Sequence, residues 1–141
     1  MLNSYDLNPS NIMDKIKQIE TNSAPQALGP YSQAILKDSF LFISGQLPLD
    51  PLTGKLVEPD ILIQVNQVLD NIAAILSAAS THWHQVVKCE IFLKNMSDFH
   101  IVNQEYSKRV SPTTPPARQT IQAAALPLDA LVEISCIAYV E

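Results

Sequence analysis

Two stretches of the chain repeat apolar residues every three or four positions, the spacing of one helical face. The first follows Asp60, and its apolar positions are Ile61, Val65, Val68, Leu69, Ile72, Ile75 and Leu76. The second follows Asp98, and its apolar positions are Phe99, Val102, Tyr106 and Val110. Aspartate is a preferred N-cap because its carboxylate accepts hydrogen bonds from free backbone N–H groups. We therefore predict helices over 60–79 and 98–110, the second ended by the proline-rich residues 111–116.

Shorter apolar segments bounded by turn residues predict five strands. They cover residues 33–36, 40–46, 86–94, 117–125 and 130–140. A tight turn at 37–39 joins the first two, and a short turn around Pro127 and Asp129 joins the last two into a predicted hairpin. The order β-β-α-β-α-β-β indicates an α+β domain whose two helices cover one face of the sheet. We place this domain at 17–141 and interpret the polar residues 1–16 as an N-terminal extension.

The last predicted strand is apolar on both of its faces, since Val132, Ile134 and Cys136 alternate with Leu131, Ile137 and Tyr139. A sheet with helices on one side should show polar alternation on the other. We therefore expect the uncovered face to pack against other subunits.

Arg118 follows two prolines and stands at the start of a predicted strand. Proline fixes its own φ and holds the preceding residue extended, so the approach to this arginine is stiff. A stiffly held guanidinium suits a carboxylate, because its N–H groups match two oxygens at once. A surface salt bridge is the alternative interpretation.

The predicted hairpin sets the neighbours of Arg118. With the turn centred near Pro127 and Leu128, Gln122 lies opposite Glu133 and Thr120 lies opposite Ser135. Arg118, Thr120, Gln122, Glu133 and Ser135 would then share one face of the sheet. Glu133 stands between Val132 and Ile134, where an unpaired carboxylate is costly, so we expect it to have a partner or a function.

Several other residues have two interpretations. Gly45, after Ser44, allows close approach of a ligand or forms a bulge. Tyr31 presents a hydroxyl to a ligand or packs at the start of a strand. Cys89 and Cys136 are expected to be reduced and buried, with a disulfide or a catalytic thiol as alternatives. His82 and His84 lack a third ligand at a recognisable spacing, so no metal site is expected.

Composition narrows the class of function. The chain has 141 residues, of which 47% are hydrophobic, and a net charge of −5. The length and the hydrophobic content indicate one domain with a sizeable core. The negative net charge disfavours a general binding surface for nucleic acid. No apolar run is long enough to span a membrane, and the first residues lack the pattern of a targeting segment. We expect a soluble, cytoplasmic protein. The three glycines are too widely spaced for a nucleotide-phosphate loop.

The chain resembles the RidA (YjgF) family of reactive intermediate deaminases in six motifs that occur in the same order. These are the segments 24–33 (APQALGPYSQ), 42–46 (FISGQ), 66–72 (NQVLDNI), 116–118 (PAR), 126–127 (LP) and 132–134 (VEI). The resemblance extends from about Lys17 to Glu141.

The resemblance implies a chorismate-mutase-like α+β fold with a mixed sheet, and a homotrimer with active sites between subunits. It implies hydrolysis of 2-imino acids and 2-aminoacrylate-type enamines to 2-keto acids and ammonia without a cofactor. By position, Arg118 matches the arginine that binds the substrate carboxylate. The matching cleft residues are Tyr31, Ser44, Gly45, Asn103 and Glu133. Thr120 stands where bacterial members often have cysteine.

Arg118 and Glu133 are therefore the expected catalytic residues, and Glu133, or a water that it orients, would deliver water and protonate the departing ammonia. A trimer that binds a small keto acid without turnover is an alternative, because the same arginine would serve it. An endoribonuclease that inhibits translation is a third, which the negative net charge disfavours.

Overall fold

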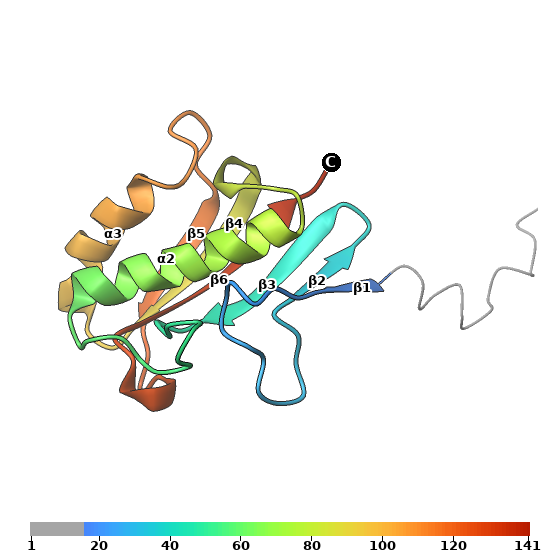
Figure 1. Cartoon of the computed structure of the whole chain (residues 1–141). Helices are drawn as coiled ribbons and strands as arrows, with labels where there is room; N and C mark the ends of the chain where they lie inside the picture. Colours follow the sequence, from blue (N-terminus) through green and yellow to red (C-terminus); the bar gives the residue numbers. More distant parts are fainter. Residues whose placement is uncertain (1–15) are drawn as a thin grey trace, which may run out of the picture.

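The structure is a computed structural model and describes residues 16–141 (Figure 1). The elements are β1 (Ile16–Ile19), β2 (Ala34–Lys37), β3 (Phe40–Gln46), α2 (Ile61–Ala78), β4 (Val86–Leu93), α3 (Phe99–Ser107), β5 (Ala117–Gln122) and β6 (Val132–Tyr139). The expected extension at 1–16 lies outside the described residues, apart from Ile16. That residue begins β1, a strand that the sequence analysis missed because it is short, mostly exposed and half polar.

All six strands form one sheet in the order β1-β2-β3-β6-β4-β5. Neighbouring strands are antiparallel, except that β4 and β5 are parallel. The predicted α+β class with a mixed sheet is therefore confirmed. β6, the strand with apolar residues on both faces, lies near the centre, between β3 and β4.

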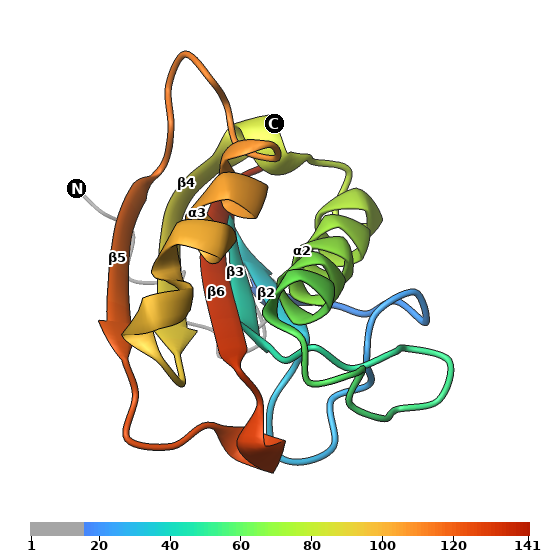
Figure 2. The same cartoon turned by 90° about the vertical axis from the view of Figure 1, so that its left-hand side faces the viewer.

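Both helices pack on the same face of the sheet (Figure 2). The predicted cap of α2 is confirmed, since Asp60 Oδ1 accepts a hydrogen bond from the Ile63 N–H at 3.0 Å. A short 3₁₀ turn at Met96–Asp98 precedes α3, and Asp98 makes no side-chain capping bond there. The apolar side of α2 is fully buried against the sheet, and each such aliphatic side chain contributes about 1.5–3 kcal/mol.

The predicted hairpin between residues 117–125 and 130–140 is wrong. β5 runs parallel to β4 at the sheet edge, and β6 pairs with β3 and β4 instead. The connection between β5 and β6 contains a short 3₁₀ turn at Pro127–Asp129, in which Leu128 and Asp129 both have a φ of 58°. A parallel pair needs a crossover connection, and α3 supplies it between β4 and β5.

The predicted shared face is wrong for the same reason. Arg118 is in register with Cys89, which is in register with the buried Cys136, so Arg118 lies on the helix-covered face. Thr120 and Gln122 share that face by strand alternation. Glu133 is in register with Phe92 and lies on the opposite, open face together with Ser135.

The open face carries exposed apolar side chains. Phe40, Phe42 and Tyr139 are 44%, 46% and 38% exposed, and the Phe40 and Tyr139 rings meet edge to face with centroids 6.1 Å apart. Ile121, on the edge strand β5, is 47% exposed. A patch of this kind is typical of surfaces that bind another protein chain.

α2 is the core helix of this domain. Its 18 residues have a mean hydropathy of 1.4, which is enough by length and composition alone to cross a membrane. The expectation that no segment reaches this length was therefore too strict. The buried residues of α2 follow one side of the helix and pack on the sheet, as in the cores of many soluble domains.

Candidate functional site

Arg118 projects from the edge strand β5 toward α3. Its Nη1 donates a hydrogen bond to Asn103 Oδ1 at 2.6 Å. Its Cζ lies 5.0 Å from the centre of the Tyr106 ring and 5.6 Å from that of Phe99. Residues 99, 103 and 106 share one side of α3, because successive helical turns bring such positions together. Aromatic faces attract the guanidinium, so α3 fixes its direction.

Arg118 makes no salt bridge among residues 16–141. The surface ion pair considered in the sequence analysis is therefore not formed within the described part of the chain. Asn103 accepts from only one of the guanidinium nitrogens. The remaining N–H groups can bind an anionic ligand.

A cavity of about 620 Å³ opens beside the guanidinium. Its lining residues come from α3 and from the proline-rich segment before β5, and they are Asn103, Tyr106, Ser107, Val110, Ser111, Pro112, Pro115, Pro116 and Arg118. The volume lies within the usual range for small-molecule sites. A cation at the edge of a cavity lined by both polar and apolar side chains suits a small organic acid.

Thr120 follows Arg118 by two residues on the same face of β5. Its Oγ1 is buried and has no hydrogen-bond partner within the described residues. A buried hydroxyl without a partner costs free energy. Its position next to Arg118 leaves it available to a ligand, to water or to a neighbouring chain.

A second cluster forms where β3 bulges. The register of β3 and β6 shifts between Ile43 and Gln46, so Ser44 and Gly45 form an irregular segment. Ser44 Oγ donates to the Ser32 carbonyl at 2.6 Å. A Cβ placed on Gly45 would lie 2.5 Å from Glu133 Oε1, so only glycine leaves room for this carboxyl group.

The Glu133 carboxyl group lies over the bulge on the open face. Burial raises its pKa above the usual range of a glutamate. The group therefore keeps its proton at a higher pH than an exposed carboxyl does, a property of side chains that exchange protons with a substrate.

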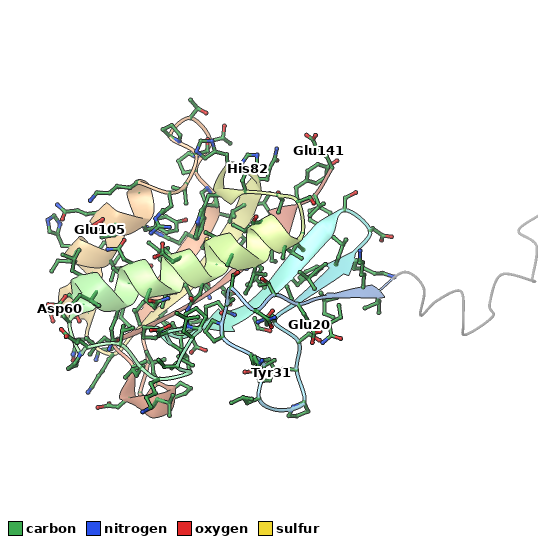
Figure 3. All side chains as sticks on the ribbon, in the orientation of Figure 1. Glu20, Tyr31, Asp60, His82, Glu105 and Glu141 are labelled. Carbon is green, nitrogen blue, oxygen red and sulfur yellow. The ribbon has the colours of Figure 1, made fainter. Side chains whose placement is uncertain are left out.

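Tyr31 is next in sequence to Ser32, whose carbonyl accepts the hydrogen bond from Ser44. This bond brings the Tyr31 backbone close to the second cluster. Tyr31 is 54% exposed, and its backbone N–H donates a hydrogen bond to the Gly29 carbonyl at 2.9 Å. Gly29 has a φ of 143°, which favours glycine. Figure 3 shows Tyr31 on the loop before β2, well away from α3.

The expected site residues thus form two groups within one chain. The first contains Asn103, Arg118 and Thr120 on the helix-covered face, and the second contains Tyr31, Ser44, Gly45 and Glu133 at the bulge of β3. Arg118 and Glu133 are on opposite faces of the sheet. One chain alone therefore does not bring the two expected catalytic residues together.

Sequence reasoning missed the two rings around Arg118. Phe99 and Tyr106 belong to the apolar stripe of the second helix, which indicates a core position and not contact with a charge. The expectation that Cys89 and Cys136 are buried and reduced is confirmed, and their side chains touch across β4 and β6. Within residues 16–141, no three His, Cys, Asp or Glu side chains are grouped to bind a metal ion.

Comparisons with known proteins show the family to which the chain belongs. The family model described as "Endoribonuclease L-PSP" matches residues 21–140. A RutC family protein from Pyrococcus horikoshii is 47% identical over 123 residues, which cover 87% of this chain and 97% of the relative. A 2-iminobutanoate/2-iminopropanoate deaminase from Capra hircus is 45% identical over 120 residues, which cover 85% of this chain and 87% of the relative.

Solved structures share the whole fold. A Rid family protein from Yersinia pestis has a TM-score of 0.86 and 48% identity, covering 89% of this chain and 99% of its own. The TdcF protein of E. coli, solved with bound serine, has a TM-score of 0.80 and 35% identity. The match covers 89% of this chain and 99% of TdcF.

Proposed function

Because this chain belongs to the endoribonuclease L-PSP family, which includes the RutC and reactive intermediate deaminase proteins, we propose that it is a 2-iminobutanoate/2-iminopropanoate deaminase. It would hydrolyse reactive imines, and the enamines of 2-aminoacrylate type that precede them, to 2-keto acids and ammonia without a cofactor. The observation that carries the proposal is the Arg118 guanidinium, held by α3 at the edge of a cavity and free of any salt bridge in the described residues.

Arg118 would bind the substrate carboxylate through two parallel N–H groups. Its contacts with Asn103 and with the ring of Tyr106 limit its rotation, so the carboxylate is held in a defined orientation. A fixed carboxylate also fixes the neighbouring C=N carbon, and positioning of this kind accelerates addition of water. Thr120 would contribute its unpartnered hydroxyl to the same side of the site.

Glu133 would exchange the protons that hydrolysis requires. The oxygen of water adds to the C=N carbon while the imine nitrogen takes up a proton, and the C–N bond then breaks as the C=O bond forms and ammonia leaves. Each step moves a proton between oxygen and nitrogen. Burial raises the pKa of Glu133, which makes the carboxyl group a better proton carrier than an exposed glutamate.

The two groups of site residues would meet between subunits of a homotrimer. Arg118 lies on the helix-covered face of one chain, and Glu133, with Tyr31, Ser44 and Gly45, would come from the open face of the next. The exposed apolar side chains of that face, Phe40 and Phe42 among them, support an interface there. Closed cyclic symmetry buries such a patch without leaving free copies of it.

The direct test generates 2-iminopropionate in situ with an amino-acid oxidase acting on alanine and follows the loss of the imine. We expect the purified protein to accelerate this loss, and Arg118→Ala to abolish the acceleration. Imine loss at the uncatalysed rate in the presence of the pure wild-type protein would overturn the assignment.

A binding protein without turnover is the second candidate, because the related TdcF of E. coli was solved with bound serine. Calorimetric titration with 2-ketobutyrate separates the two candidates when it is combined with the imine assay. Under either candidate Arg118→Ala loses binding. Glu133→Ala should keep binding and lose turnover if the protein is an enzyme, whereas a binding protein has no turnover to lose.

The family description also names endoribonuclease activity. The net charge of −5 offers little attraction to the phosphate backbone of RNA. We expect no cleavage of RNA after rigorous removal of contaminating nucleases. Cleavage that copurifies with the protein and is lost in Arg118→Ala would favour this third candidate.

A further inference from the structure

Two cysteines meet inside the sheet. The Sγ atoms of Cys89 on β4 and Cys136 on β6 are 3.4 Å apart, although the residues are separated by 47 positions in the sequence. Both thiols are free, and their residues are 0% and 3% exposed. β4 and β6 are neighbours in the sheet (Figure 2).

The backbone around this pair fits a disulfide. Cys89 and Cys136 are directly opposite in an antiparallel pair of strands, where Cα atoms are about 4.5 or 5.5 Å apart. Both values fall within the Cα–Cα range of about 4.4–6.8 Å found for disulfides. The sulfurs must approach from 3.4 Å to about 2.05 Å, which a change in the side-chain torsions can supply.

The surroundings give the two thiols different reactivity. A hydrogen bond from Cys136 lowers the pKa of Cys89, with further help from Tyr106 and from the charge of Arg118, against the opposing effect of burial. Burial raises the pKa of Cys136, so that thiol keeps its proton. This is the arrangement of an attacking thiolate beside a thiol that resolves the first product.

A small oxidant can approach from the cavity next to Arg118. Tyr106 lines that cavity and is close enough to Cys89 to influence the pKa of the thiol, although its hydroxyl makes no hydrogen bond within the described residues. A rearrangement of the Tyr106 side chain would open a path from the cavity to the buried Cys89 sulfur. Hydrogen peroxide is small enough to use such a path, whereas a bulky disulfide reagent is not.

We propose that Cys89 and Cys136 form a reversible oxidation site that closes to an internal disulfide with a peroxide as oxidant. The Cys89 thiolate attacks one peroxide oxygen, the O–O bond breaks, and the leaving hydroxide takes a proton to become water. The Cys136 sulfur then attacks the sulfur of the Cys89 sulfenic acid and loses its proton. The S–O bond breaks and a second water leaves, so two thiols and one peroxide give one disulfide and two waters.

The test uses the folded wild-type protein, reduced and freed of reductant, and treated with hydrogen peroxide. The peroxide is removed with catalase, the protein is denatured in excess N-ethylmaleimide, and free thiols are counted as maleimide adducts in the intact mass. We expect loss of both thiols, a peptide pair linked through Cys89 and Cys136 in non-reducing mass spectrometry, and recovery of both thiols with dithiothreitol. The mass of the intact chain should fall by two hydrogen atoms.

Cys136→Ser serves as the matched variant, because its hydroxyl can still donate a hydrogen bond to Cys89 while no resolving thiol remains. In this variant we expect Cys89 to stop at a sulfenic acid that dimedone traps, whereas the wild type gives no dimedone adduct. The wild-type thiol count needs no variant and so remains decisive if Cys136→Ser does not fold. Two intact thiols after peroxide treatment, disulfides between chains, or sulfinic acid without a linked peptide would each overturn the proposal.

Discussion

Arg118 takes its direction from side chains that belong to a different element, α3. Replacing it with alanine removes the N–H groups proposed to bind the carboxylate. Charge-assisted hydrogen bonds contribute about 1.5–3 kcal/mol each, so we expect kcat/KM for 2-iminopropionate to fall by roughly 100-fold or more. Steady-state kinetics with the in situ imine assay measures this loss.

Arg118→Lys and Arg109→Ala are the controls for this prediction. Lysine keeps the charge but loses the planar pair of donors, so we expect it to recover only part of the activity. Arg109, the other arginine of the chain, pairs with Asp70 at 2.7 Å and does not line the cavity. An equal loss of activity in Arg109→Ala would show that overall charge, and not the position of Arg118, matters.

The buried carboxyl group of Glu133 should make the stability of the folded protein depend on pH. Burial raises its pKa, so the folded chain holds this proton at pH values where the unfolded chain has lost it. The stabilisation is fully present below the ordinary pKa of glutamate and is lost as the pH rises through the folded-state pKa. Glutamine cannot ionise. We therefore expect Glu133→Gln to have the wild-type Tm at acidic pH and a higher Tm at neutral pH.

Glu90→Gln is the matched control, because Glu90 lies on the same open face and pairs with Lys88 at 3.5 Å. We expect no gain in Tm at neutral pH from this change. Thermal unfolding of the three proteins across the acidic-to-neutral range provides the comparison. A neutral-pH Tm of Glu133→Gln at or below the wild-type value would contradict the buried carboxyl interpretation.

At the scale of elements, the cap of α2 is open to a direct test. Asp60 Oδ1 accepts a hydrogen bond from the Ile63 N–H, and loss of such a cap costs about 1 kcal/mol. We expect Asp60→Ala to lower the free energy of unfolding by about this amount without altering activity. Glu58→Ala, two residues earlier and outside the helix, should leave stability unchanged in the same denaturant titration.

The helices were predictable because their signals are local. The apolar stripe from Ile61 to Leu76 and the cap at Asp60 lie within one continuous segment, and the structure confirms both. β1 was not predictable, because Lys17 and Gln18 interrupt any alternation at this exposed edge. The order of the last strands was also missed. A short turn predicts a hairpin, but which strands pair depends on contacts between distant segments.

That error in pairing had a consequence for the site. Strand alternation correctly placed Arg118 and Thr120 on one face, since it depends only on positions within β5. The relative face of Glu133 depends on how β5, β4 and β6 align, and no local pattern specifies this. The resemblance to the RidA family implied one cleft for all of these residues, and the structure shows that one chain keeps Arg118 and Glu133 on opposite faces of its sheet.

At the scale of the whole molecule, the proposed sites between subunits can be tested by mixing two inactive variants. Arg118→Ala keeps an intact Glu133, and Glu133→Gln keeps an intact Arg118. Trimers assembled from equal amounts of both would join two intact halves in about one quarter of their sites. We therefore expect unfolding and joint refolding to restore about one quarter of wild-type activity, measured with the imine assay.

Each variant refolded alone serves as the control and should stay inactive. Light scattering on the same samples reports their mass. A mixture that gains no activity although it forms trimers would contradict sites shared between chains. So would a monomer of about 15.6 kDa that hydrolyses imines at the wild-type rate.

The placement of Arg118 and Glu133 on opposite faces has a genetic consequence. In the proposed trimer each chain takes part in two sites, giving its arginine to one and its carboxyl group to another. A chain defective in both residues therefore inactivates two sites wherever it assembles. In a cell that makes intact and defective chains equally, only about one quarter of the sites would be whole, and not half. Such an allele would be partly dominant over the intact gene.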